Sequence, residues 1–186
     1  HLSDMEIHAV KSIFANGGLP FTTSMGRLFD AVAAITGAAF ENEYEAYAPM
    51  RLQAEAEKAD RKTNRIYKFQ IKLNNNENSA IQTLDFSPAI HAIAKDVIAG
   101  IDIAQIAMRF HYTIAQGIAK TMTMIAEQFS TKTAVVSGGV FQNRLLLELL
   151  ANELRGNLKL IIPEKNPPND EGIAMGQAYW VANMNS

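Results

Sequence analysis

The chain has 186 residues, of which 48% are hydrophobic and 19% are charged, and it has no cysteine. Its 17 lysines and arginines against 19 aspartates and glutamates give a net charge of −2, which argues against a nucleic-acid-binding surface or a polybasic membrane patch. Without cysteine it has no disulfide framework, thiolate zinc site or thiol nucleophile. No apolar stretch is long enough to span a membrane. We therefore expect one globular unit, located in the cytoplasm.

Residues 1–60 are predicted to be helical. Thr23 or Ser24 can cap a helix whose apolar residues recur on one face, and Gly37 is a typical stop. The apolar residues of that face are Leu28, Val32 and Ile35. A second helix is expected over 50–58.

Residues 61–87 are predicted to form a β-hairpin. The segment 66–73 alternates in polarity and contains Ile, Tyr and Phe, which is typical of a strand. The polar run over 74–79 predicts the turn, and residues 81–86 are expected to be the partner strand.

Residues 88–186 are predicted to begin with two helices. Pro88 suits the first turn of one that ends at Gly100. Asp102 can cap the second, a long helix whose apolar stripe runs as far as Phe129.

A strand, helix, strand, helix sequence is predicted to follow. The strands are expected over 133–136 and 159–162, a leucine-rich helix over 145–154, and a last helix from near Asp170. This order predicts a parallel strand pair, and the fold class is therefore α/β.

Gly138 and Gly139 follow a predicted strand and precede a predicted helix. Two glycines at that place allow the backbone to approach a flat or phosphorylated ligand closely, and a helix N-terminus favours an anion. A tight turn is the commoner reason for such a pair. Asn143 can either cap the following helix or contact a ligand, and the cap is the favoured role.

Two carboxylates are each open to two interpretations. Asp170 lies where the cap of the last helix belongs, which is its favoured role, and the alternative is a ligand for a hard cation. Asp30 and Arg27 lie opposite the apolar face of their helix, where a solvated pair explains them; the alternative is a carboxylate that binds a ribose. His111 is expected to be a hydrogen-bonded packing residue. The sequence has no Walker loop, full G-x-G-x-x-G motif or serine nucleophile elbow.

Four stretches of the chain, in order, resemble the HypF family of carbamoyltransferases, which begin the synthesis of the cyanide ligands of nickel–iron hydrogenases. They are TSMGRLFDAVAAITG at 23–37, IAMRFH at 106–111, VSGGVFQN at 136–143 and PPNDEGIAMGQ at 167–177. The family is multidomain, and this chain resembles the C-terminal lobe of its last domain. The resemblance therefore implies a fragment of a larger chain.

The implied fold is the actin-like, sugar-kinase-like fold shared with the tRNA threonylcarbamoyladenosine enzymes, here with a helical insertion and a β-hairpin. In the family, carbamoyl phosphate and ATP give carbamoyl adenylate, and the carbamoyl group then passes to the C-terminal cysteine of the partner HypE. The implied cofactors are ATP and a divalent metal, which iron, zinc or magnesium would satisfy. The implied partners are a HypE-type protein, carbamoyl phosphate, and the N-terminal lobe and other domains missing here, with no nucleic acid or membrane.

Site residues follow from the same resemblance, position by position. Gly138 and Gly139 would lie against the adenosine, and Asp30 would accept hydrogen bonds from the ribose hydroxyls. The full set of expected nucleotide-binding residues is Gly26, Asp30, Gly138, Gly139 and Asn143. Asp170 would be the one metal ligand that this lobe contributes. The catalytic residues stay unknown.

The chain also departs from the family pattern. Ala46 and Tyr47 stand where the family usually has glycine and glutamine, Gln53 where glutamate is usual, and Glu171 where glycine is usual. Two other functions therefore stay open: a nucleotide- or partner-binding module without catalysis, and a relative of the tRNA threonylcarbamoyladenosine type. The 186 residues alone are expected to fold but to be inactive, and to expose an apolar patch where the missing lobe docks.

Overall fold

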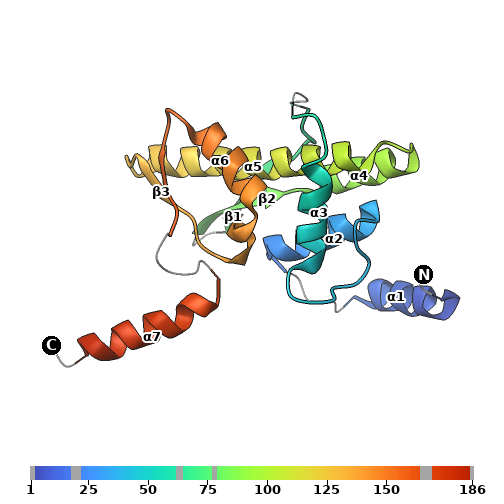
Figure 1. The fold of residues 1–186 in the computed structure, drawn as a ribbon, viewed down its shortest axis with the longest axis horizontal. Coiled ribbons are helices and arrows are strands. Elements are labelled where there is room, and N and C mark those ends of the chain that lie inside the picture. Colours follow the sequence, from blue (N-terminus) through green and yellow to red (C-terminus); the bar gives the residue numbers. More distant parts are fainter. Residues whose placement is uncertain (1–2, 18–21, 62–64, 77–78, 164–168, 185–186) are drawn as a thin grey trace.

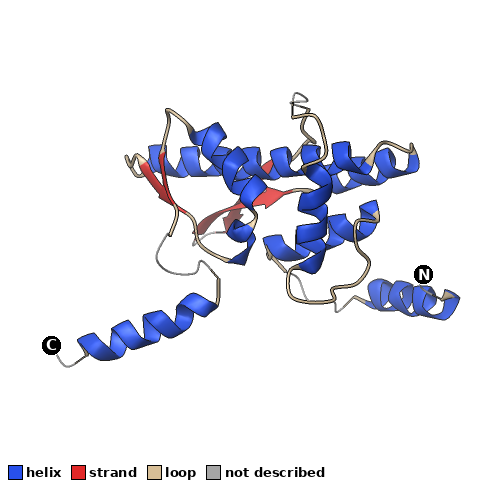
Figure 2. Cartoon of the chain, in the orientation of Figure 1, coloured by secondary structure: helices blue, strands red, loops and turns tan. Residues whose placement is uncertain are grey.

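The part of the chain that the structure describes is mostly helical and has two small two-stranded sheets (Figures 1 and 2). The structure is a computed structural model that describes residues 3–17, 22–61, 65–76, 79–163 and 169–184. In chain order, the elements are α1 (Asp4–Asn16), α2 (Met25–Thr36), α3 (Tyr47–Ala56), β1 (Gln70–Asn76), β2 (Ser79–Asp85), α4 (Ser87–Ile98), α5 (Ile103–Gln128), β3 (Thr133–Val135), the 3-10 helix η1 (Gly139–Gln142), α6 (Arg144–Leu154), β4 (Lys159–Ile161) and α7 (Glu171–Asn183).

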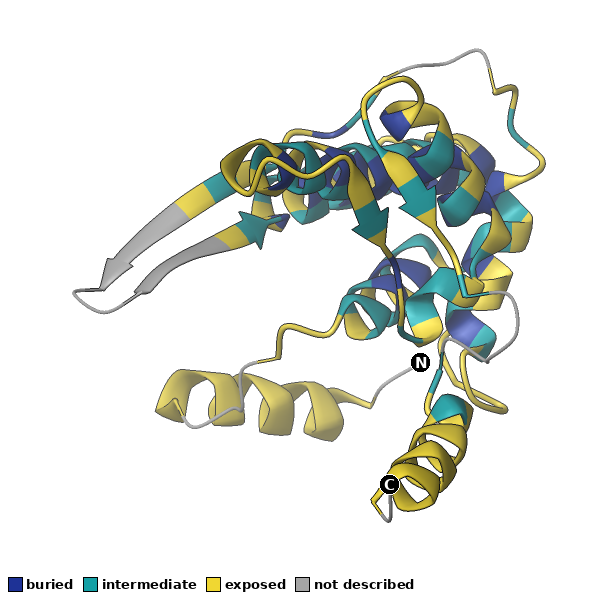
Figure 3. Ribbon diagram, turned by 90° about the vertical axis from the view of Figure 1, so that its left-hand side faces the viewer, coloured by how far each residue is buried: buried dark blue, intermediate teal, exposed yellow. Residues whose placement is uncertain are grey.

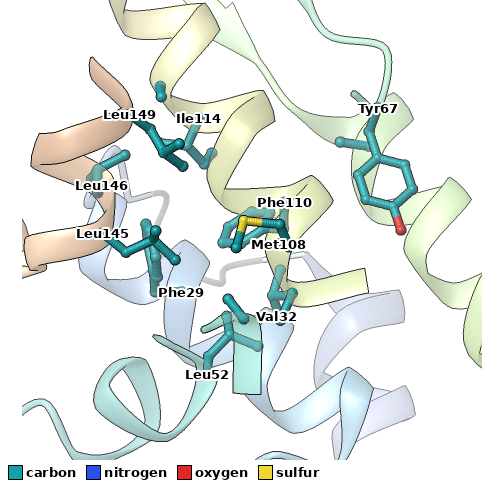
Figure 4. Packing of buried hydrophobic residues seen from close by; sticks show 14 of the residues in the cluster. Phe29, Val32, Leu52, Tyr67, Met108, Phe110, Ile114, Leu145, Leu146 and Leu149 are labelled. Carbon is teal, nitrogen blue, oxygen red and sulfur yellow. The ribbon is translucent and has the colours of Figure 1, made fainter. Parts of the chain in front are cut away.

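The 26-residue helix α5 organises the core. It begins at Asp102, whose side chain accepts a hydrogen bond from the Ala104 amide as the predicted cap. Helices α3 and α6 pack along α5, and α2 packs on α3. Figure 4 shows the leucines of α6 and Phe29 of α2 gathered around the apolar side chains of α5. Burial of a large apolar side chain contributes about 1.5–3 kcal/mol, so this four-helix contact is the main source of stability. Its fully buried side chains include Phe29, Val32, Leu52, Ile106, Met108, Phe110, Ile114, Leu146 and Leu150.

The predicted ends of α2 are confirmed, and its buried face lies slightly off the predicted one. Ser24 caps the helix by accepting a hydrogen bond from the Arg27 amide, and Gly37 ends it in the left-handed conformation. Val32 is buried as predicted, but Phe29 and Ala33, which the predicted face omitted, are equally buried. Leu28 is only partly buried.

Helix α3 starts three residues earlier than predicted, at Tyr47. The reason is local: the Asn42 side chain accepts a hydrogen bond from the Ala48 amide at 2.9 Å, which satisfies a donor of the first turn. Ala46, immediately before the helix, has φ 62° and lies in the left-handed region that favours glycine.

The β-hairpin is present, but its turn is not where the polar run predicted it. Strands β1 and β2 are antiparallel, and the pairing extends to Asn76 opposite Ser79. Asn74 and Asn75 therefore belong to β1, and residues 77–78 of the predicted turn lie outside the described residues. The backbone pairing overrides the low strand propensity of asparagine.

The base of the hairpin is fixed to α5 by close packing. A Cβ built on Gly117 of α5 would come within 3.0 Å of the Phe86 ring, so only glycine lets the ring lie this close. Just before β1, Tyr67 donates a hydrogen bond from its hydroxyl to Asp96 at 2.8 Å. Arg109 pairs with the same carboxylate at 2.5 Å and stacks over the Tyr67 ring. These contacts join the hairpin, α4 and α5.

Strands β3 and β4 pair in parallel, as predicted from the strand–helix–strand order. Helix α6 connects them, and α5 and α6 contact β3 and β4 respectively. The fold is thus a mixture of helices and strands consistent with the α/β class.

The two terminal helices carry the most exposed apolar surface. Figure 3 shows α1 and α7 lying apart from the buried centre, and no residue of either helix is buried. On α7, Trp180 is 68% exposed and Tyr179 73% exposed. The expectation for the end of α5 was wrong: Ala126 is still buried, but Ile125 is 44% and Phe129 71% exposed. No helix among the described residues is both long and apolar enough to cross a membrane.

Candidate functional site

Gly138 forms a turn after β3 that requires glycine. The hydrogen bonding between β3 and β4 continues one residue beyond β3, because the Val136 amide donates to the Ile161 carbonyl at 3.2 Å. At Gly138 the backbone has φ 104° and ψ 155°, a conformation that side-chain-bearing residues rarely adopt. A Cβ there would meet no atom within 4 Å. The glycine is therefore demanded by the backbone, and the space in front of it is open.

Asn143 ends η1 and begins α6. Its side-chain Oδ1 accepts a hydrogen bond from the Leu146 amide at 2.8 Å, so the predicted helix cap is confirmed. Its own amide donates to the Val140 carbonyl at 3.2 Å and closes η1. The other end of its side chain, Nδ2, lies 3.0 Å from His111 Nε2. Asn143 thus links the Gly138–Gly139 turn to the middle of α5.

His111 is the hydrogen-bonded packing residue that was expected. It is fully buried, and its ring meets the Phe29 ring edge to face with 5.2 Å between centroids. Its Nδ1 lies 2.8 Å from the Ala107 carbonyl oxygen. Burial is the main cause that lowers the pKa of His111 from 6.5 to about 4, so the ring is neutral at pH 7.

The loop before α7 reaches the same turn. A Cβ built on Gly139 would lie 4.0 Å from Asn169 Cβ. The Asn169 side-chain oxygen is buried and has no hydrogen-bond partner, which is a costly arrangement unless a donor is supplied. Sequence reasoning did not single out Asn169; its place beside Asp170 in the PPND stretch was the available signal.

The prediction that the Asp170 side chain caps the last helix is wrong. Asp170 is the residue before α7, but its exposed carboxylate makes no capping hydrogen bond to the helix. The first turn is closed by main-chain bonds instead, with the Gly172 amide donating to the Asn169 carbonyl at 3.0 Å. The carboxylate thus remains available beside the turn. Among the described residues, no three histidine, cysteine, aspartate or glutamate side chains lie together as a metal site.

Helix α2 carries Asp30, the other carboxylate of the predicted site. It contacts η1, so part of the helix lies near the Gly138–Gly139 turn. Asp30 pairs with Arg27 at 3.0 Å, and its side chain keeps 24% of its exposed area, as the solvated-pair interpretation predicted. Gly26 has ordinary space around it, since a Cβ there would meet only Ser24 Oγ at 3.6 Å. The structure therefore gathers elements of three motifs along one edge: α2, the glycine turn and the loop before α7.

Comparisons with known proteins agree on one family. A family model described as "Carbamoyltransferase, Kae1-like Domain, second subdomain" matches residues 3–177. Carbamoyltransferase HypF of Rhizobium leguminosarum bv. viciae is 34% identical over 87% of this chain and 20% of its own length. Carbamoyltransferase HypF of Synechocystis sp. is 31% identical over 94% of this chain and 21% of its own. The chain thus spans about a fifth of the length of these curated relatives.

Solved structures give the same result. A crystal structure of full-length HypF in the phosphate- and nucleotide-bound form matches with a TM-score of 0.83 and 28% identity, over 98% of this chain and 24% of that one. The structure of T.kodakarensis HypF matches in fold, with a TM-score of 0.78, 23% identity and coverage of 95% of this chain and 22% of that one. On these grounds the chain belongs to the HypF carbamoyltransferase family, as the second subdomain of its Kae1-like domain.

Proposed function

We propose that this chain forms one side of the ATP-binding cleft of a carbamoyltransferase, with the adenosine on the Gly138–Gly139 turn. The observation that carries the proposal is the convergence of three motifs at that turn: α2 contacts η1, and Gly139 lies against Asn169. The open space at Gly138 and the buried, unpartnered oxygen of Asn169 both suit a ligand with a hydrogen-bond donor, such as a nucleoside. Asp30, on α2, is the residue proposed to bind the ribose hydroxyls.

A divalent metal can bind at this edge only if other parts of a longer protein also supply ligands. Asp170 offers one exposed carboxylate without a capping bond, and the chemistry of a carboxylate suits magnesium, iron or zinc. One carboxylate alone does not hold such an ion, so we propose that the remaining ligands come from elsewhere in a longer protein. When bound, the metal would stabilise negative charge on the carbamoyl oxygen. The chain's own contribution is to hold Asp170 beside the glycine turn.

The reaction we propose is that of the family the chain resembles. Water cleaves carbamoyl phosphate to carbamate and phosphate, and carbamate attacks the α-phosphorus of ATP to give carbamoyl adenylate and pyrophosphate. The thiolate of the C-terminal cysteine of a HypE-type protein then attacks the carbamoyl carbon, which gives the S-carbamoyl cysteine and releases AMP. In that reaction the turn at Gly138 and Gly139 holds the adenosine, and Asp30 fixes the ribose. Ala46, which stands where the family has glycine, keeps a left-handed backbone, so this departure costs strain without removing the turn.

The test is carbamoyl transfer by the full-length gene product to a HypE-type C-terminal cysteine. Asp30→Ala and Asp170→Ala are expected to abolish transfer. Glu148→Ala, which breaks an exposed ion pair with Arg61 elsewhere, is the matched control for the loss of the Arg27–Asp30 pair and should transfer normally. Carbamoyl-phosphate-dependent ATP–pyrophosphate exchange, run alongside, reports adenylation by any other domain. Exchange without transfer in the wild type would instead support a non-catalytic binding module.

A further inference from the structure

The side-chain pair of His111 and Asn143 connects the core to the glycine turn. His111 lies in the middle of α5 and is fully buried against the rings of Phe29 and Phe110. Asn143 is only partly buried and stands between η1 and α6. The 3.0 Å contact between them is the side-chain bridge from the rigid core to the segment that follows Gly138 and Gly139.

The hydrogen-bond partners fix the direction of this bridge. Asn143 Oδ1 accepts from the Leu146 amide, so the other end of its side chain is the amide nitrogen, a donor. His111 Nε2 must therefore accept, and Nδ1 carries the proton. That assignment agrees with the second contact of the ring, because the Ala107 carbonyl oxygen at 2.8 Å from Nδ1 can only accept. Both ring nitrogens are thus satisfied by a neutral imidazole in one tautomer.

Asn143 in turn holds the backbone on both sides. Its main-chain amide closes η1 on the Val140 carbonyl, and its side chain caps α6 at Leu146. An Asn143 side chain that lost its acceptor would leave a part-buried donor unpaired, which costs about 1–3 kcal/mol. Its rotation away from His111 would release the cap as well, since the same amide group makes both bonds.

We propose that His111 is a positioning residue that holds the Gly138–Gly139 turn in its nucleotide-binding conformation, through its acceptor bond to Asn143. The effect on affinity rests on the proposed function, whereas the effect on the turn does not. His111 itself lies fully buried and acts through Asn143 rather than on a ligand.

Two substitutions of His111 separate this role from packing. His111→Gln places an amide oxygen near the position of Nε2 and can still accept from Asn143, but loses the bond to Ala107. His111→Asn places an amide nitrogen near Nδ1 and keeps the bond to Ala107, but loses the acceptor for Asn143. Both variants remove the ring from the core, so their losses of unfolding free energy should be similar.

The experiment compares these variants in the full-length gene product by hydrogen exchange of the 138–146 amides and by ATP titration. We expect His111→Asn to exchange faster there and to bind ATP roughly tenfold more weakly, while His111→Gln keeps most of the wild-type protection and affinity. Asn143→Ser, which keeps a cap but is too short to reach His111, should behave like His111→Asn even if the core variants do not fold.

Wild-type exchange at 138–146 in both His111→Asn and Asn143→Ser would overturn the proposal. So would equal losses of protection in His111→Asn and His111→Gln, because these would reflect packing alone. Absence of ATP binding by the wild type would count against the proposed function, and the exchange result would still decide the role of His111.

Discussion

Acidification should destabilise the fold through His111. Burial lowers its pKa in the folded chain to about 4, from the usual 6.5. The folded state therefore disfavours the proton that the unfolded state binds below about 6.5. The contribution of neutral His111 is complete above that pH and is lost progressively as the pH falls toward 4.

The size of this effect follows from the two pKa values. The interval between 6.5 and about 4 corresponds to about 3 kcal/mol of unfolding free energy, lost at about 1.4 kcal/mol for each pH unit. Because domains of this size have only about 5–15 kcal/mol of stability, a loss of that order is readily measured. The ring is fully buried, so solvent screening does not reduce the effect much.

The loss of unfolding free energy is measured by urea unfolding of the chain at pH values from 4.5 to 7.5, followed by circular dichroism. His111→Gln removes the titrating group, whereas the carboxylates and the other histidines are the same in both proteins. The difference in unfolding free energy between wild type and variant should shrink as the pH falls, with the slope given above. Parallel curves for the two proteins would refute the assignment of a neutral, buried His111.

Three further changes test the packing described above by urea unfolding. Ala46→Gly should stabilise the chain by up to about 1 kcal/mol, because φ 62° is unfavourable for alanine. Gly117→Ala should destabilise it by about 1–3 kcal/mol, since the new Cβ would lie 3.0 Å from the Phe86 ring. Tyr67→Phe should cost about 1 kcal/mol by removing the hydrogen bond to Asp96, whose carboxylate keeps its pairing with Arg109.

Gly176→Ala on α7 is the matched control for Gly117→Ala. A Cβ at Gly176 would meet no atom within 4 Å, and alanine favours a helix, so this variant should be at least as stable as the wild type. Equal effects at the two glycines would contradict the close contact between α5 and Phe86. A destabilising Ala46→Gly would likewise contradict the left-handed backbone at that position.

Local signals in the sequence predicted much of the fold. The caps at Ser24, Asp102 and Asn143 are confirmed, because a short polar side chain before an apolar run satisfies amides of the first turn. The stop at Gly37 and the parallel pairing of β3 and β4 are also confirmed.

The errors arose where the outcome depends on distant parts of the chain. Periodicity extends the apolar stripe of α5 to Phe129, but the core ends before it. The strand propensity of Asn74 is low, yet pairing with β2 keeps it in the strand. Asp170 has the residue type and place of a cap, but main-chain bonds close that turn.

Only part of the candidate site, likewise, could be predicted from the sequence. The need for glycine at Gly138 and the packing role of His111 could be read from the residues around them. The proximity of Asn169 to Gly139 could not, because 30 positions of chain separate the two and only the tertiary fold brings them together. The roles of Asp30 and Asp170 toward ribose and metal stay predictions.

The most direct test of nucleotide binding at the glycine turn is ATP titration by calorimetry of the full-length gene product, with two glycine variants. Gly138 and Gly156 both have positive φ, 104° and 86°, and a Cβ at either would meet no atom within 4 Å. Both alanine variants should therefore lose about 1–2 kcal/mol of stability through backbone strain. We predict that Gly138→Ala loses tenfold or more in ATP affinity while Gly156→Ala binds like the wild type. Wild-type affinity in Gly138→Ala would contradict a nucleotide on this turn.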